Sequence, residues 1–422
     1  MRFKNIKRIL PIILATAVCI LGCGGNVPAV SENTTEVMRT DPEKVLSTDL
    51  YVAEVVCDSS IDVPVYDFEK AAVPDSDAFA FVSDMGLGWN LGNTFDAVTT
   101  GEVQGAGLSL EMSWCGINTT KEMIDSIKTA GFNTIRIPVS WHNHLKDNYE
   151  IAERWMDRIE EIVRIAYEDD LYVIINIHHD IDEKYYYPDR DHFANSSEYM
   201  YKIWEQIAER FKDYDHHVIF EAVNEPRLVG TDVEWWYMPG NAKATEAIEC
   251  INDLNQIFVD TVRESGGYNT DRYLMIPSYD QSVQGTMDSA FVLPADTVEG
   301  RMILSVHAYT PYDFALNMSG TSVFDESGKG EIDSFLSDLY GKYVCNGIPV
   351  VMTEFGALDK NNLQDRVNFT AYYTARAASY GIPVIWWDNN AFAGSGENFG
   401  IFNRSTLTFT FGDILNAMLL NK

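Results

Sequence analysis

The sequence predicts an α/β fold, a single (β/α)8 barrel (TIM barrel) that follows an N-terminal signal and an acidic spacer. Two observations predict it. From about residue 76 onward, short apolar runs rich in β-branched residues recur eight times, and segments with apolar residues at helical spacing lie between them. Continuous apolar runs are typical of parallel strands buried on both faces, and eight strand-helix units over roughly 340 residues are typical of a closed barrel.

The expected strands, in chain order, are Leu87–Leu91, Thr134–Val139, Tyr172–Ile177, Val218–Val223, Tyr273–Pro277, Met302–Val306, Pro349–Thr353 and Pro383–Trp387. The clearest expected helices are Ile151–Ile165, Ile203–Phe211, Ile248–Val262 and Val367–Ala378. A doubly wound open sheet is the alternative. No Gly-x-Gly-x-x-Gly or Walker-type loop follows an expected strand, which removes most of the support for a nucleotide-binding form of that sheet.

Residues 1–22 have the pattern of a bacterial secretory signal. Four basic residues precede Ile9–Leu21, an apolar stretch that is too short to span a bilayer comfortably. The stretch ends in Ile20-Leu21-Gly22-Cys23, which resembles a lipoprotein cleavage site. We therefore expect Cys23 to be lipid-modified and to begin the mature chain, on the extracellular face of a bacterial cell and tethered to its membrane. Ordinary cleavage and secretion is the alternative.

Residues 23–75 are rich in Ser, Thr, Asp, Glu, Val and Pro and have little periodicity. We expect them to form a flexible acidic spacer, with a short strand near Leu50–Val56. The barrel domain then covers residues 76–422. Of the cysteines that follow Cys23, none forms a Cys-x-x-Cys pair, which argues against a zinc site and against a dense disulfide framework.

The charge of the chain excludes one class of partner. Lys+Arg 31 against Asp+Glu 63 gives a formal net charge of −32. Phosphate backbones and anionic lipid headgroups are bound through Lys and Arg, so nucleic acid is an unfavourable ligand and neutral or cationic ligands are favoured.

Polar residues follow seven of the eight expected strands. In a (β/α)8 barrel the active site is built where the strands end, so these residues are candidates for function. A single His or Asn could be a satisfied polar group in the core, but seven such strand ends are hard to explain in that way. The candidates are Asn93, Arg136, His178, His179, Asn224, Glu225, His307, Tyr309, Glu354 and Trp387.

Two carboxylates stand out because each follows an apolar strand directly. Glu225 comes after Val223-Asn224, and Glu354 after Val350–Thr353, where a purely structural Glu would be costly to desolvate. Two carboxyl groups that face one cleft are what glycoside hydrolysis needs: a protonated acid for the leaving oxygen, and a nucleophile or base at the anomeric carbon. The alternative is that one of the two only pairs with a cation.

The neighbouring residues fit this chemistry. Asn224 can hydrogen-bond a sugar 2-hydroxyl, Arg136 can hold a nearby carboxylate ionised, and Trp387 offers a flat apolar face for a pyranose ring. Further aromatic candidates, each as easily explained by packing, are Trp89, Trp114, Trp235 and Trp236.

A metal-dependent hydrolase is a rival interpretation, suggested by His178-His179-Asp180. Adjacent histidines on a strand point to opposite faces, so both cannot easily bind one ion, and no His-x-His follows the first strand. We expect neither a metal nor an organic cofactor.

Several longer motifs resemble glycoside hydrolase family 5 over about residues 80–420. They are Gly88–Thr94, Gly131–Trp141, Val173–Asp180, Phe220–Pro226, Ser305–Tyr309 and Thr353–Gly356. The runs Asn224–Gly230 and Trp387–Asn390 look most like its subfamily 4, which includes bacterial endoglucanases. Ser113–Asn118 departs from the pattern of relatives, which leaves the loop after the first strand and its sugar subsites open.

The resemblance implies a retaining mechanism, with Glu225 as acid/base and Glu354 as nucleophile. It also implies that Arg136, His178, Asn224, His307, Tyr309 and Trp387 line the subsite at the cleaved bond; Asn93 and His179 are added as strand-end candidates. The expected activity is an endo-β-1,4-glucanase on cellulose or mixed-linkage glucan, acting as a monomer. A xyloglucanase or licheninase of the same family is the first alternative, and a non-catalytic cell-surface glycan-binding protein is the second.

Overall fold

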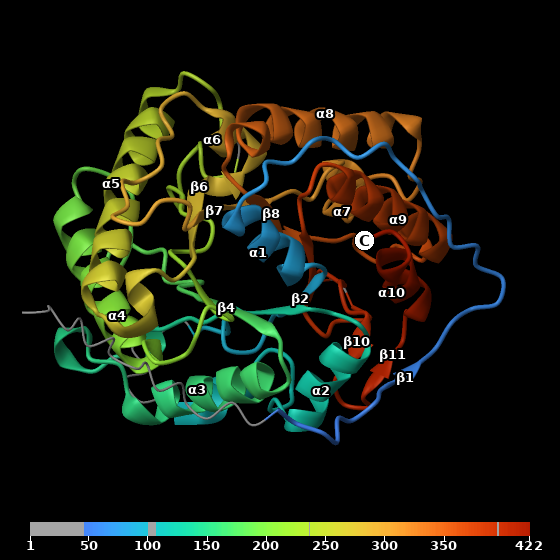
Figure 1. Cartoon of the computed structure of the whole chain (residues 1–422), viewed down its shortest axis with the longest axis horizontal. Coiled ribbons are helices and arrows are strands. Elements are labelled where there is room, and N and C mark those ends of the chain that lie inside the picture. Colours follow the sequence, from blue (N-terminus) through green and yellow to red (C-terminus); the bar gives the residue numbers. More distant parts are fainter. Residues whose placement is uncertain (1–45, 100–106, 236, 395) are drawn as a thin grey trace, which may run out of the picture. The chain divides into compact units, whose positions relative to one another are not determined.

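Eight parallel strands close into a barrel in the computed structural model, which describes residues 46–99, 107–235, 237–394 and 396–422 (Figure 1). In order around the barrel, the strands are β2 (Gly88–Leu91), β3 (Thr134–Ile137), β4 (Tyr172–Asn176), β5 (Val218–Glu221), β6 (Leu274–Ser282), β7 (Met302–His307), β8 (Val350–Phe355) and β9 (Val384–Asp388). All eight expected strands are confirmed, and β9 pairs with β2 to close the ring.

Helices surround the barrel (Figure 1). They are α1 (Asp77–Met85), α2 (Lys121–Thr129), α3 (Glu153–Glu168), α4 (Phe193–Phe211), α5 (Ala242–Glu264), α6 (Val283–Met287), α7 (Tyr312–Ala315), α8 (Glu326–Lys342), α9 (Leu363–Ser379) and α10 (Gly412–Leu419). Short 3-10 turns are η1 (Gly107–Met112), η2 (His142–His144), η3 (Asp147–Tyr149), η4 (Gly267–Thr270) and η5 (Val344–Asn346). The four expected helices correspond to α3, α4, α5 and α9, which confirms the helical spacing.

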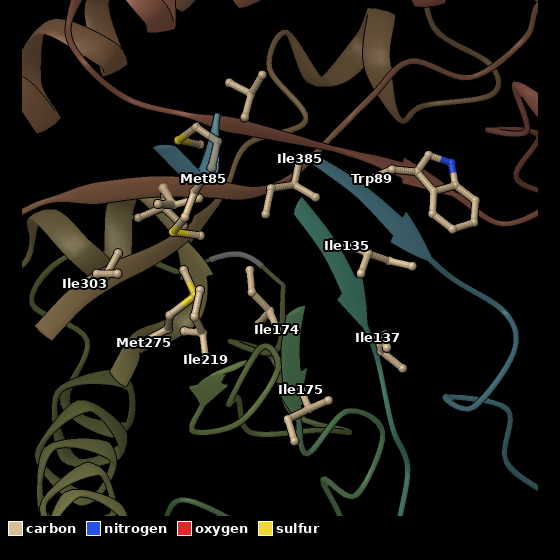
Figure 2. Close-up of a cluster of buried hydrophobic side chains, with 14 of the residues drawn as sticks. Met85, Trp89, Ile135, Ile137, Ile174, Ile175, Ile219, Met275, Ile303 and Ile385 are labelled. Carbon is tan, nitrogen blue, oxygen red and sulfur yellow. The ribbon is translucent and has the colours of Figure 1, made fainter. Parts of the chain in front are cut away.

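An apolar layer fills the lower part of the barrel, and a polar layer lies above it. Side chains two residues apart on a strand share a face. Ile174 therefore lies below Asn176 on β4, and Ile219 lies below Glu221 on β5; all four are fully buried. Figure 2 shows side chains of the apolar layer, including Ile174, Ile219, Ile303 and Ile385. The polar residues are thus held on an apolar floor.

Helix α1 lies across the end of the barrel at which the strands begin. Its apolar residues Ala78, Phe79, Val82 and Met85 are buried. The hydroxyl of Thr134, the first residue of β3, donates to the Met85 carbonyl at 2.6 Å. This end is therefore closed by the chain itself, and the other end is left for the site.

The expected spacer differs from the structure from residue 46 onward. Residues 46–75, here called the N-terminal strap, run along α10, α9 and α8 before α1 (Figure 1). The expected short strand is β1 (Glu54–Val55). It pairs in parallel with β11 (Thr408–Phe409), which pairs in turn with β10 (Phe402–Asn403).

The strap is held by contacts that leave no periodic pattern in a sequence. The ring of Tyr372 on α9 meets Tyr66 and Phe68 edge to face, with centroids 5.2 and 5.4 Å apart. Asn421 accepts from the Tyr66 amide at 2.8 Å and donates to the Pro64 carbonyl at 2.9 Å. Isolated apolar residues and side-chain-to-backbone hydrogen bonds fix an extended segment without a helical or strand repeat, so composition alone favoured a spacer.

Two further expectations concern the N-terminal signal and the pairing of the cysteines. The signal, the Cys23 lipidation site and the first part of the expected spacer lie outside the described residues. Cys57, Cys115, Cys250 and Cys345 are free thiols. Within the described ranges, none of the helices combines the length and the apolar character that crossing a bilayer requires.

The strap generates a test of stability. Replacing Asn421, which is 5% exposed, by alanine leaves the Tyr66 amide and the Pro64 carbonyl without their partner. Leaving buried groups unpaired costs about 1–3 kcal/mol, so Asn421→Ala should lower the free energy of unfolding by that amount in urea titrations. The exposed Ser337→Ala on α8 is the control and should change it by less than about 0.5 kcal/mol. Equal stability of the two variants would contradict the role assigned to the strap.

Candidate active site

The guanidinium group of Arg136 forms the centre of the polar layer. Its Nε donates to Glu221 Oε2 at 2.8 Å, and its Nη1 donates to Glu354 Oε1 at 2.7 Å. Nη1 also reaches Asn90 Oδ1 at 3.0 Å, and Nη2 donates to Asn224 Oδ1 at 2.8 Å. One fully buried cation on β3 thus connects side chains that belong to or follow three other strands, β2, β5 and β8.

Glu221 is the second buried charge, and the sequence reasoning missed it. Asn176 Nδ2 donates to its Oε2, and Gln281 Nε2 and the Ser305 hydroxyl donate to its Oε1. Burial acts to raise the pKa of Glu221, but Arg136, His307 and the Ser305 hydroxyl together outweigh burial, and the pKa is lowered. The signal that could have found it is a single acidic residue inside the expected apolar strand Val218–Val223.

Glu354, on β8, is almost completely buried and accepts a hydrogen bond on each oxygen. Besides Arg136, the hydroxyl of Tyr309 donates to Oε2 at 2.9 Å. Burial, and then Glu354 itself, raise the pKa of Tyr309 well above its ordinary value, so the hydroxyl keeps the proton that it donates. Both donors favour the ionised carboxylate.

Glu225 follows β5 in a strained turn, with φ of 42°. Its amide donates to Gln281 Oε1 at 2.7 Å, and its Oε1 lies 2.9 Å from His307 Nδ1. The other ring nitrogen of His307 lies 3.7 Å from Glu354 Oε1. One carboxylate oxygen of Glu225 and one of Glu354 lie within 4.8 Å of each other. The two expected carboxylates therefore face each other, with His307 between them.

Protons are distributed unequally over these groups. Burial acts to raise the pKa of Glu225, but His307, Arg227 and His179 outweigh it and lower the pKa to about 2. Burial raises the pKa of Glu354, although His307 and Arg136 oppose the rise. Carboxyl groups this close repel each other's charge, so a proton on one lowers the pKa of the other.

His178 and Trp387 form one wall. Their rings are parallel, 3° apart, with centroids 5.9 Å apart. Asn176 Nδ2 lies 3.2 Å from His178 Nδ1, and the amide is oriented because its Oδ1 accepts from the Val139 amide. His178 Nδ1 is therefore an acceptor and Nε2 carries the proton. Burial lowers the pKa of His178 well below its ordinary value and keeps the ring neutral.

The tautomer of His178 also bears on metal binding. Asp96, His178 and His179 offer donor atoms within 4.8 Å of one another. On His178, however, one nitrogen accepts from Asn176 and the other carries a proton, so neither has a free lone pair. Glu225, His307 and Glu354 form a second such group, but it contains the two carboxylates that the sequence predicts to carry out hydrolysis.

Asn93 and His179 lie toward the rim. The Asn93 amide donates to Asp96 Oδ2, and His179 Nε2 lies 3.9 Å from the same oxygen. Burial lowers the pKa of His179 to about 4, so it is neutral at neutral pH. Among the described residues, no hydrogen bond joins the side chain of either residue to Glu225 or Glu354.

Of the other candidate tryptophans, one lies in the core and two are partly exposed. Trp89 is fully buried and packs against Phe402, so it is a core residue. Trp114 is 44% exposed beside His179, and Trp235 is 53% exposed beneath Arg227, whose guanidinium carbon lies 3.8 Å from the ring centre. Trp236 lies outside the described residues.

A cavity of about 520 Å³ adjoins Glu225. Its lining includes Trp235, Asp280, His307, Tyr309, Tyr312 and Glu397. A second cavity, of about 500 Å³, lies between the strap, α1 and α9, and no carboxylate or histidine lines it. The cavity at the strand ends thus joins aromatic surfaces to titratable groups.

Comparison with known proteins assigns the chain to a family. Residues 96–393 match the model of the family Cellulase (glycosyl hydrolase family 5). Endoglucanase B of Ruminococcus albus is 45% identical over 339 residues, which cover 80% of this chain and 78% of that protein. Endoglucanase A of Clostridium longisporum is 40% identical over 370 residues, which cover 86% of this chain and 69% of that protein.

Solved structures agree with the sequence comparison. A variant of a glycoside hydrolase family 5 lichenase from Caldicellulosiruptor sp. F32, in complex with cellotetraose, has a TM-score of 0.84 and 49% identity, and covers 86% of this chain and 99% of that chain. A GH5-4 broad specificity endoglucanase from Ruminococcus champanellensis with bound cellotriose has a TM-score of 0.77 and 44% identity, over 83% of this chain and 100% of that chain.

The buried ion pair of Arg136 and Glu221 should contribute to the stability of the fold. Glu221→Gln keeps the shape but removes a charge that faces a fully buried guanidinium. Breaking a buried pair costs about 3–5 kcal/mol. Because Arg136 keeps Glu354 as a partner, the loss of unfolding free energy at pH 7 should lie at the lower end, about 3 kcal/mol.

The pH dependence has a definite sign. The pKa of Glu221 is lowered in the folded state, so its contribution is complete above the unfolded value of about 4.3 and is lost as the pH falls below it. The difference between wild type and Glu221→Gln should therefore shrink below about pH 4 in urea titrations. The exposed Glu331→Gln is the control. A Glu221→Gln variant as stable as this control at pH 7 would sink the prediction.

Proposed function

The chain belongs to glycoside hydrolase family 5, and from that premise we propose that it cleaves by double displacement, with Glu354 as the nucleophile and Glu225 as the acid/base. It is an endo-β-1,4-glucanase, a glycosidase that hydrolyses internal bonds of a β-glucan. One observation supports the retaining mechanism above all. The carboxylate oxygens of Glu225 and Glu354 approach within 4.8 Å. Retaining enzymes keep these groups about 5–5.5 Å apart, whereas inverting enzymes leave about 6.5–9.5 Å for a water molecule.

In the first step, Glu354 attacks the anomeric carbon while the bond from that carbon to the leaving oxygen breaks. Glu225 gives its proton to that oxygen. The hydrogen bonds from Arg136 and Tyr309 hold Glu354 in place and favour its charge. Asn224, itself oriented by Arg136, is placed to bind a sugar hydroxyl near the reacting carbon.

In the second step, Glu225 takes a proton from water as the water oxygen attacks the anomeric carbon. The bond to Glu354 breaks, and the product keeps the original configuration. Without substrate, the pKa of Glu225 is lowered to about 2, so the proton lies elsewhere in the cluster and has to be on Glu225 before the first step.

The substrate class follows from the walls of the cleft and from the relatives. Trp387 presents an aromatic face beside His178, and Trp235 and Tyr312 line the adjoining cavity. Neutral sugars stack on such faces and need no charge partner. Relatives solved with cellotetraose and cellotriose support a linear β-glucan, and the lichenase supports mixed-linkage glucan. Carboxymethylcellulose, barley β-glucan, xyloglucan and mannan form the panel that ranks these substrates.

Two variants test the assigned roles. Glu354→Gln and Glu225→Gln should each lower reducing-sugar release from barley β-glucan by at least about 10³-fold, because one lacks the nucleophile and the other the acid. On a dinitrophenyl cellobioside, whose leaving group needs no proton, Glu225→Gln should still form the glycosyl-enzyme at a near wild-type rate, whereas Glu354→Gln should not. NMR of the wild-type product should first show the β anomer. An α product would assign Glu354 a different role.

The location of the enzyme is a separate proposal. We propose a lipoprotein tethered to the outside of the membrane through Cys23, supported by the basic start, the apolar stretch Ile9–Leu21 and the residues around Cys23. Outside the cell the enzyme would meet a polymer that cannot cross the membrane.

Fractionation tests this location. The wild type should partition with membranes, and Cys23→Ala should move it to the soluble fraction. Cys57→Ala is the matched control and should leave the partition unchanged. Finding the wild type entirely in the soluble fraction would contradict the anchor.

A further inference from the structure

Strand β6 is interrupted beside Glu225. Its pairing with β7 shifts register between Pro277 and Ser282. Within this bulge, Asp280 and Gln281 have φ of 57° and 46°, a conformation that non-glycine residues rarely adopt. Two consecutive strained residues persist only where the surroundings hold them, and such strain is concentrated at functional sites.

The bulge holds the turn that carries Glu225 from two sides. Gln281 Oε1 accepts from the Glu225 amide at 2.7 Å, while its Nε2 donates to Glu221. The Asp280 amide donates to the Pro226 carbonyl at 2.9 Å. The two residues of the bulge therefore bond to the main chain at Glu225 and at the residue after it.

Asp280 lines the cavity that Glu225 also lines. Its Oδ1 is buried and has no hydrogen-bond partner among the described residues. The charged groups that act on Asp280 are Glu225, Arg227 and Glu234. A second carboxyl group thus faces the acid/base from a strand that carries no other part of the proposed mechanism.

We propose that Asp280 is a positioning residue for the proton donor, and that its carboxyl group and that of Glu225 act as a pair which holds one proton. This rests on the proposed role of Glu225 as acid/base. With Asp280 charged, its repulsion keeps the proton on Glu225, which is the form that the first step requires.

The pKa of Asp280 and the pKa of Glu225 shift in opposite directions, as expected for two carboxyl groups that share one proton. Burial, and then Glu225, raise the pKa of Asp280 well above its ordinary value, while that of Glu225 is lowered. In the arrangement without substrate the pair therefore places the proton on Asp280. The negative charge on Glu225 is then stabilised by His307, and a leaving oxygen that approaches Glu225 favours the other proton position.

Other groups act on Glu225 as well and must be kept constant in a test. They are His307 on β7, Glu354 on β8, His179 after β4, Tyr309 after β7, Glu397 after β9 and Arg227 in its own loop. None of them is changed by a substitution at Asp280, so a shift in the titration of Glu225 would report the pair.

The pH profile of kcat/KM on barley β-glucan tests the proposal. Its basic limb reports the free enzyme, and therefore the loss of the one proton that the pair of Asp280 and Glu225 holds. Asp280→Asn removes the repulsion that holds this proton, so the limb should move to lower pH by about one unit or more. Asp280→Glu keeps the charge and should stay near wild type. Asp253→Asn, an exposed site on α5, makes the same charge change away from the cavity and should not move the limb.

A dinitrophenyl cellobioside separates this effect from a structural one. Its leaving group needs no proton, so the basic limb of kcat/KM in Asp280→Asn should match wild type on this substrate. A loosened bulge would instead lower the rate on both substrates at every pH without moving the limb.

Three outcomes decide between the inferences. An unmoved limb in a folded Asp280→Asn variant overturns the pairing. If Asp280→Asn does not fold, carboxyl ¹³C NMR of the wild type decides: the Asp280 carboxyl should titrate in the same steps as that of Glu225, and an Asp280 carboxyl that titrates independently of Glu225 overturns the proposal. Full activity of Glu225→Gln on barley β-glucan would instead overturn the proposed function, independently of any result at Asp280.

Discussion

The active site depends on the buried guanidinium of Arg136. A charge removed from water is tolerated only with close, well-oriented partners. Here Glu221 and Glu354 supply the counter-charge, and Asn90 and Asn224 accept the remaining hydrogen bonds. These partners come from different strands or from the turns that follow them. A change in the register of any one strand would turn its polar side chain away, so the cation specifies the barrel closure and the active site together.

Strain is concentrated at the end of the barrel where this cluster lies. Non-glycine residues with positive φ follow or interrupt β2, β5, β6 and β9 at Asn93, Glu225, Asp280, Gln281 and Asn390. At β5 and β6 the strain is held by hydrogen bonds between the two turns, which also reach Glu221 through Gln281. The turn that carries Glu225 is therefore held by the same buried hydrogen-bond network that holds Glu354 through Arg136.

Much of the barrel could be predicted because parallel strands buried on both faces need continuous apolar runs. Glu225 and Glu354 were predictable because each directly follows such a run. Glu221 was not singled out, because it lies inside the apolar run Val218–Val223 and not at the end of an expected strand, where the candidate carboxylates were sought. The strap was misjudged because its contacts, such as those of Asn421, join residues that are far apart in the chain. Asp280 could not be predicted, because it reaches the site only through the bulge in β6. A bulge shifts the direction of side chains and leaves no pattern in the sequence.

The site holds more carboxyl groups than its reaction needs, and this surplus has a physical use. Burial acts to raise the pKa of Glu225, but His307 and Arg227 act against burial and the pKa is lowered, which makes Glu225 a poor acid without substrate. Extra negative charge from Glu354, Asp280 and Glu397 opposes those cations. When Glu354 is esterified its charge is lost, and Glu225 becomes easier to ionise at the step in which it acts as a base. One residue can therefore serve as acid and then as base because its neighbours, which lie on different strands, change charge during the reaction.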